Sequence, residues 1–77
     1  MNQVEISREP IELYKLLKME GLVPSGGEAK LVISLGEVRV NGEVETRKRK
    51  KIVDGDIVSF GDESFCVVFN AEGLTAE

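Results

Sequence analysis

The ten residues EVRVNGEVET, at positions 37–46, place an Asn-Gly pair between two runs in which polar and apolar side chains alternate. Alternation with a period of two is typical of a strand that has one buried face. Both central residues of the tightest hairpin turns take a positive φ angle, which Asn and Gly tolerate best. We therefore predict an antiparallel hairpin that turns at Asn41 and Gly42.

Helical periodicity precedes this hairpin in two segments. Residues 11–20, IELYKLLKME, have an apolar stripe at Leu13, Leu16 and Leu17, with Pro10 suited to the first turn and Gly21 to the end of the helix. A second helix is predicted to begin at Ser25, because Glu28 three residues later completes a capping box. Its stripe continues through Ala29, Val32 and Ile33, and Gly36 ends it.

Short strands account for the remaining apolar segments. QVEIS at 3–7 alternates like a strand, IVDGDIVSF at 52–60 turns at Asp54-Gly55, and FCVVF at 65–69 is a continuous apolar run. The predicted order is β-α-α-β-β-β-β, an α+β fold in which two packed short helices cover a small, mostly antiparallel sheet of about four to five strands. We expect one domain over residues 1–77, with a core motif at about 11–60 and a flexible tail at 70–77.

Composition argues against several kinds of site. The chain has no His and a single cysteine, Cys66, so it lacks the commonest general base, the commonest metal ligand and any intramolecular disulfide. Cys66 lies in an apolar run and is expected to be a small buried side chain. No apolar run has the roughly 18 residues needed to cross a bilayer. The first ten residues lack a secretory signal pattern. We expect a cytoplasmic protein with no catalytic residue, metal or cofactor.

Charge is divided unevenly along the chain. The net charge is −4, but residues 25–52 contain seven basic and four acidic residues, a net of +3, which leaves −7 for the rest. The run RKRKK occupies residues 47–51. Lys and Arg on a loop or edge strand prevent sheet aggregation, but two or three would suffice. Five in an otherwise acidic chain indicate a polyanionic partner.

The stretch SGGEAK at 25–30 has the glycines of a phosphate-binding loop but not the spacing of one. A P-loop has the form G-x-x-x-x-G-K-[ST] after a strand, whereas here Lys30 is three residues past the second Gly and a helix comes before. Two explanations of Gly26 and Gly27 remain open. They allow a tight turn between two packed helices, or they let a phosphate approach the helix start, where free backbone amides attract anions.

Aromatic side chains are few. Tyr14 is the only Tyr, there is no Trp, and Phe60, Phe65 and Phe69 lie in strand patterns expected to be core. Base-stacking platforms of the kind that bind single strands are therefore not expected, and base stacking is the less favoured mode of recognition. Recognition of backbone and shape, as in structured RNA, is favoured.

The segment from Leu13 to Phe60 resembles the S-four RNA-binding domain, also called the alpha-L module. The matching parts are LLKMEGLVPSGGEAK as two helices, LGEVRVNGE as the turn into a hairpin and KKIVDGDIV as the closing strand pair. The resemblance implies RNA binding on the second helix and the loop between hairpin strands. Family members often have Arg where this chain has Glu12 and Gly26.

These observations predict a non-catalytic bacterial RNA-binding protein, a monomer that contacts phosphates of ribosomal or transfer RNA, with ribosomal or RNA-processing proteins as further partners. The predicted contacts are Ser25, Gly26, Gly27, Lys30, Arg39, Asn41, Gly42, Arg47, Lys48, Arg49, Lys50 and Lys51. The alternative is an adaptor whose basic loop binds an acidic protein surface. An RNA-modifying enzyme is the third possibility, disfavoured because no catalytic domain or His is present.

Overall fold

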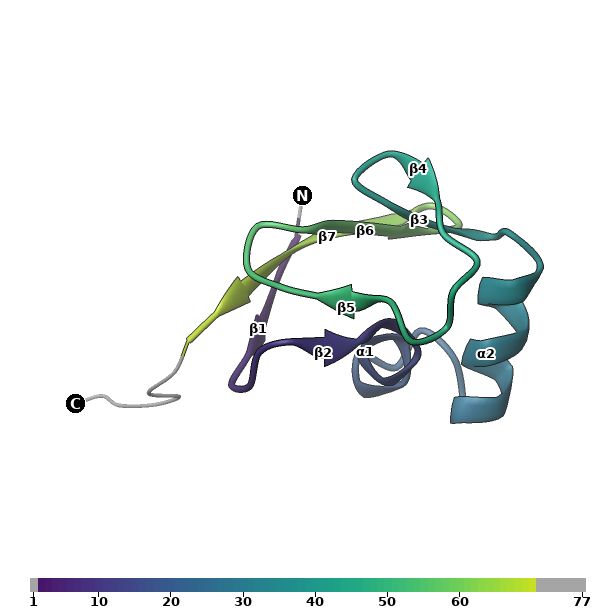
Figure 1. Cartoon of the computed structure of the whole chain (residues 1–77), viewed down its shortest axis with the longest axis horizontal. Helices are drawn as coiled ribbons and strands as arrows, with labels where there is room; N and C mark the ends of the chain where they lie inside the picture. The colour runs from purple at the N-terminus through teal and green to yellow at the C-terminus, as the bar shows by residue number, and fades with distance from the viewer. Residues whose placement is uncertain (1, 71–77) are drawn as a thin grey trace.

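The structure, a computed structural model, describes residues 2–70. Within this range the chain forms, in order, β1 (Asn2–Ile6), β2 (Ile11–Glu12), α1 (Leu13–Met19), α2 (Gly26–Ser34), β3 (Val38–Val40), β4 (Glu43–Val44), β5 (Lys51–Ile52), β6 (Ile57–Phe60) and β7 (Glu63–Phe69). Figure 1 shows the elements along the chain. Neither helix in these residues has the length and apolar character needed to span a membrane.

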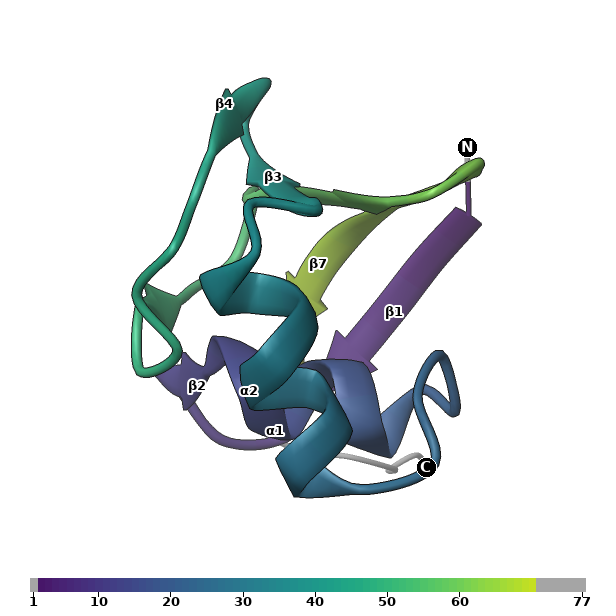
Figure 2. The ribbon, with the colours of Figure 1, turned by 90° about the vertical axis from the view of Figure 1, so that its right-hand side faces the viewer.

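Five strands form the main sheet in the order β1-β7-β6-β3-β4, and β2 pairs with β5 in a separate two-stranded sheet. The neighbours in the main sheet are antiparallel except β1 and β7, which run parallel with Val4 opposite Val67. Both helices lie on one side of the main sheet (Figure 2). The predicted α+β class and mostly antiparallel sheet are therefore confirmed, with one parallel pair added.

The start of α1 differs from the prediction. Residues Ile11 and Glu12, expected in the helix, are instead extended and pair with Ile52 and Lys51. The helix begins at Leu13 because two main-chain carbonyls of the segment before β5 accept hydrogen bonds from its first amides: Leu13 N to Lys50 O at 2.9 Å and Tyr14 N to Lys48 O at 3.1 Å. Pro10 therefore lies before β2 rather than in the first turn of α1.

The start and end of α2 follow the predicted local signals. Ser25 has extended backbone angles, and its hydroxyl accepts a hydrogen bond from the Glu28 amide at 3.2 Å. Ala29, Val32 and Ile33 are buried. Gly36, with a φ of 80°, follows the helix. A Ser cap and a left-handed Gly thus bound α2, as in many helices.

The predicted hairpin turn is confirmed. Asn41 and Gly42 have φ angles of 54° and 86° and join β3 to β4. The predicted closing strand pair is not one: β5 pairs with β2, whereas β6 pairs with β3 and β7. The turn at Asp54-Gly55 therefore leads the chain from the small sheet into the main sheet.

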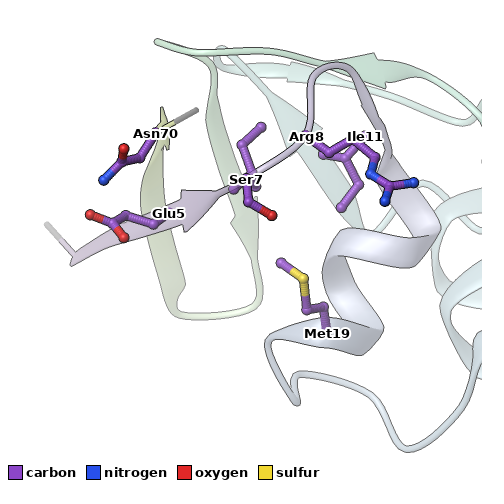
Figure 3. A pocket seen from close by; sticks show the side chains of 7 residues that line it. Glu5, Ser7, Arg8, Ile11, Met19 and Asn70 are labelled. Carbon is purple, nitrogen blue, oxygen red and sulfur yellow. The ribbon is translucent and has the colours of Figure 1, made fainter. Parts of the chain in front are cut away.

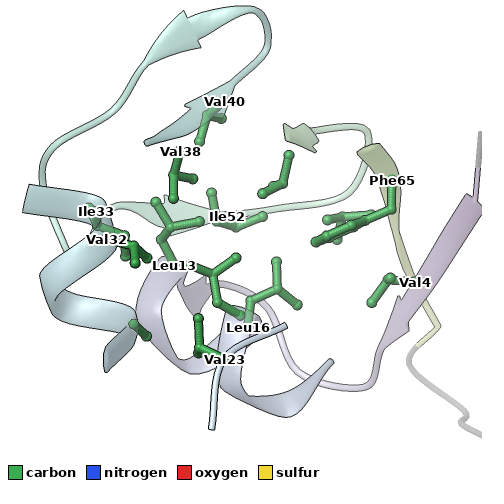
Figure 4. Packing of buried hydrophobic residues seen from close by; sticks show 14 of the residues in the cluster. Val4, Leu13, Leu16, Val23, Val32, Ile33, Val38, Val40, Ile52 and Phe65 are labelled. Atoms are coloured by element: carbon green, nitrogen blue, oxygen red, sulfur yellow. The ribbon is translucent and has the colours of Figure 1, made fainter. Parts of the chain in front are cut away.

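The core fills the space between the main sheet and the helices (Figure 4). Ile52 is completely buried and lies between Val38 of β3 and Leu13 of α1. Phe65 is buried, and Phe60 and Phe69 pack against the core while partly exposed. Cys66 is only half-buried, so the prediction of a buried cysteine is wrong. Residues 71–77 of the predicted tail lie outside the described residues.

Candidate nucleic-acid interface

Residues 47–51, here called the basic loop, lead from β4 into the small sheet and are fixed through their main chain. The Lys50 amide donates to Arg47 O at 3.1 Å, and the carbonyls of Lys48 and Lys50 accept from the first two amides of α1. None of these bonds uses a basic side chain. The shape of the basic loop therefore does not depend on where its five charges point.

The basic loop forms one side of a shallow groove of about 780 Å³, here called the basic groove. The lining residues are Ser34, Thr46, Arg47, Lys48, Arg49, Lys50 and Lys51. Ser34 comes from the C-terminal end of α2. All five predicted cations thus line a single depression, where their potentials add.

Glu45 modifies this charge. Its carboxylate accepts hydrogen bonds from the Arg47 amide at 3.0 Å and from Arg47 Nε and Nη2 at 2.8 and 3.2 Å. The side chain of Glu45 is 13% exposed and that of Arg47 is 71% exposed. The bond from Arg47 lowers the pKa of Glu45, and the same pairing raises the pKa of Arg47. Part of the Arg47 charge is therefore neutralised within the loop.

Gly26 and Gly27 are not required by the fold. A Cβ on Gly26 would lie 3.9 Å from two Tyr14 ring carbons, and a Cβ on Gly27 would lie 3.9 Å from the Ser25 hydroxyl oxygen. Both distances are ordinary van der Waals contacts, and neither Gly has a positive φ. Sterics therefore do not require glycine at either position, and both explanations drawn from the sequence remain open.

Tyr14 connects the helix start with the basic loop. Its ring touches the position of Gly26, and the Lys30 ammonium lies 4.7 Å from the ring centroid. Its amide is bonded to the Lys48 carbonyl. Gly26 and Lys30 are therefore connected to the basic loop through one aromatic residue.

The three remaining predicted residues belong to the hairpin. Arg39 donates from Nη1 to the Gly42 carbonyl at 3.3 Å, and its neighbours in β3 are both buried, so it points to the sheet face away from the core. The side-chain Nδ2 of Asn41 donates to Asp56 Oδ1 at 3.0 Å, and its Oδ1 accepts from Ile57 N at 2.9 Å. Arg39 does not line the basic groove. The fold itself accounts for Asn41 and Gly42.

Sequence reasoning did not single out Ser34, Thr46 or Glu45. Thr46 lines the groove as the residue directly before the basic loop, and Ser34 lines it from the C-terminal end of α2. Glu45 was detectable, because an acidic residue two positions before an Arg in an extended loop is within reach of its guanidinium.

A separate hollow of about 400 Å³ lies beside the end of β1 (Figure 3). Met19 of α1 faces it together with Ser7 and Arg8, and Glu5 also lines it. One acidic and one basic side chain give this hollow no excess of positive charge. Over residues 2–70, no three His, Cys, Asp or Glu side chains are grouped so that they could hold a metal ion.

Comparison with known proteins identifies the family of this chain. A family model described as "S4 domain" matches residues 4–68. The chain is 55% identical over 58 residues to "Putative RNA-binding protein YbcJ" of Escherichia coli (strain K12), a match that covers 75% of this chain and 83% of that protein. It is 41% identical over 68 residues to "Probable ribosome maturation protein RlbA" of Bacillus subtilis (strain 168), covering 87% and 96% of the two chains.

The solution structure of the E. coli protein, described as revealing an alpha-L motif involved in RNA binding, superimposes with a TM-score of 0.68. The two chains are 49% identical in that comparison, which covers 88% of this chain and 87% of the other. The resemblance seen in residues 13–60 thus extends over nearly all the described residues. This chain belongs to the S4 domain family and has the alpha-L fold.

Proposed function

We propose that this chain is a non-catalytic RNA-binding protein, and that it contacts the phosphate backbone of a folded RNA, ribosomal or transfer RNA, through the basic groove and the start of α2. The observation that carries the proposal is the basic groove, in which five consecutive cations line one open depression. The name of the E. coli relative supports RNA as the partner, and the name of the B. subtilis relative supports a link to ribosome maturation. The protein acts as a monomer in the cytoplasm.

Binding is electrostatic and depends little on base identity. A phosphate contact releases condensed counterions, so the logarithm of affinity falls with the logarithm of salt by about 0.7 to 0.9 per contact. If all five side chains of the basic loop meet phosphates, the slope is about −3.5 to −4.5. If Arg47 stays bound to Glu45, four contacts remain and the slope is about −2.8 to −3.6.

Fluorescence anisotropy with labelled ribosomal and transfer RNA fragments over a salt series tests the proposal. Wild type is compared with a variant that has Ala at all five positions of the basic loop. Alanine keeps the Lys48 and Lys50 carbonyls that bind α1, so this variant should fold, which circular dichroism checks. We expect weaker binding and a shallower salt slope for the variant.

A matched pair of single variants tests the position of the contact. Arg49→Ala removes one charge from the basic groove, and Arg8→Ala removes one charge from the hollow beside β1. The first should reduce the slope by about 0.7 to 0.9, and the second should leave it unchanged.

The possible failures have different meanings. If no RNA binds at low salt, the proposal is wrong and the adaptor with an acidic protein partner takes its place. If RNA binds equally well without the five charges, RNA remains the partner but the basic groove is not its site.

A further inference from the structure

The start of α2 and the exposed side of α1 border an open hollow of about 560 Å³, here called the Tyr14 hollow. Its lining residues are Ile11, Tyr14, Lys15, Lys18, Met19 and Gly26. The volume falls within the roughly 300–1,000 Å³ typical of small-molecule sites. It is distinct from the basic groove, with which it shares no lining residue.

The Tyr14 hollow combines an apolar surface with a cationic rim. Tyr14 and Ile11 are half-buried against the core, and Met19 is 52% exposed. The ammonium groups of Lys30 and Lys15 lie 4.7 and 5.9 Å from the Tyr14 ring centroid. No acidic side chain lines this hollow, unlike the one beside β1, although Lys15 is paired at 3.6 Å with Glu12, which is not a lining residue. Its ligand should therefore have a flat apolar face and a negative charge close to it.

A nucleotide has both properties. We propose that the Tyr14 hollow takes one unstacked nucleotide of the bound RNA, with its base against the Tyr14 ring and its phosphate held by Lys15, Lys18 or Lys30. This inference rests on the proposed function and adds to it a site for a single base. A lone aromatic side chain cannot follow a series of bases, but bases splayed out of a folded RNA commonly stack singly on Tyr.

Two contacts support this occupant. The Tyr14 amide donates to the Lys48 carbonyl at 3.1 Å, so the residue that carries the ring is anchored directly to the basic loop. Gly26 leaves the ring edge uncovered, because its missing Cβ would stand 3.9 Å from ring carbons Cδ2 and Cε2. This open edge gives a base access to the ring, and sterics do not require the missing side chain.

The test compares two RNA probes of equal charge: hexaadenylate, and a hexamer of abasic ribose phosphates. Wild type should bind hexaadenylate about 5- to 150-fold more tightly than the abasic hexamer at the same salt, the range found for one base stacked on an aromatic side chain. Tyr14→Phe, which keeps the ring, should retain this ratio. Tyr14→Leu should reduce it to about one.

The composition of the chain supplies a second readout. Because Tyr14 is the only Tyr and there is no Trp, tyrosine emission reports on this ring alone. Hexaadenylate should quench the emission, corrected for absorption by the probe, and the abasic hexamer should not. If Tyr14→Leu does not fold, Gly26→Ala replaces it, since its methyl group fits the free chain but narrows the hollow.

The outcomes separate this inference from the proposed function. Equal, salt-dependent binding of both hexamers without quenching would overturn the nucleotide site and leave phosphate binding intact. If only folded RNA binds, equal affinities of Tyr14→Phe and Tyr14→Leu for it would overturn the site as well. If no RNA binds, both proposals fail.

Discussion

Glu45 accepts three hydrogen bonds from Arg47 although it stands at the edge of the most basic part of the chain. A carboxylate there reduces the mutual repulsion of the neighbouring cations. It also fixes the guanidinium of Arg47 in one orientation, so this residue begins the basic loop with a defined geometry. The remaining four basic side chains have no such partner among the ion pairs of residues 2–70.

This pair predicts a local response to acid. The pKa of Glu45 is lowered below its ordinary value of 4.5, chiefly by the hydrogen bond from Arg47. The contribution of the pair to stability is therefore complete above the ordinary value and is lost as the pH falls through the lower pKa of the folded state. In NMR spectra, the Arg47 Nε–H resonance should shift with a midpoint below 4.5.

Glu45→Gln is the control, because it preserves the size of the side chain but cannot titrate. The Arg47 resonance should then show no such midpoint. A midpoint at or above the ordinary value in wild type would contradict the pairing.

At the scale of elements, the first turn of α2 contains two glycines that the stability of the helix does not require. Gly27→Ala replaces a poor helix former with a good one, so the free energy of unfolding should stay the same or rise by up to about 0.5–1 kcal/mol. RNA affinity should fall about tenfold or more, because the added methyl group keeps a phosphate away from the amide, and a lost hydrogen bond to a charged group costs about 1.5–3 kcal/mol. Chemical denaturation and anisotropy measure the two effects.

Leu31→Ala is the matched control within α2. Leu31 is 48% exposed and lies beyond the first turn, so its replacement should leave RNA affinity unchanged. An unchanged affinity for Gly27→Ala would show that no phosphate approaches this amide, and would return the glycines to a purely structural explanation.

Elements with a local cause could be predicted from the sequence, and elements with a distant cause could not. The Ser25 cap and the Asn41-Gly42 turn are set by neighbouring residues, and the structure has both. Strand β2 exists because Lys51 and Ile52 pair with it, and nothing near Ile11 indicates that partner. The parallel pairing of β1 with β7 is likewise a long-range contact.

The candidate interface likewise has a part that can be predicted from the sequence and a part that depends on contacts between distant residues. The basic loop is visible as a run of charge, but the side of the molecule that completes its groove is not, because Ser34 comes from another element. The small number of aromatic residues in the chain predicts no base-stacking role for Tyr14. The position of Tyr14 between Lys30 and Gly26 depends on how α1 packs against α2. Composition alone does not predict that packing.

For the whole molecule, stability depends on a small core shared by both sheets. Ile52 belongs to β5 and is completely buried between the main sheet and α1. Ile52→Ala should lower the free energy of unfolding by about 2–5 kcal/mol, through lost transfer energy and the cavity left behind. Chains of this size often have little more than that in total, so the variant should be partly unfolded at 37 °C.

Ile52→Val provides the graded control, with an expected loss of about 0.5–1.5 kcal/mol. Urea denaturation followed by circular dichroism measures both variants. A cost for Ile52→Ala no larger than that of Ile52→Val would show that β5 is not part of the cooperative core.

The main-chain bonds between the basic loop and α1 have a consequence for how such a protein can diversify. The Lys48 and Lys50 carbonyls that bind the Leu13 and Tyr14 amides are present whatever residue occupies those positions. The side chains at residues 47–51 can therefore be substituted without loss of the main-chain bonds that hold the basic loop to α1. The same fold can in this way evolve a preference for a different RNA by substitution of a few exposed side chains in the basic loop.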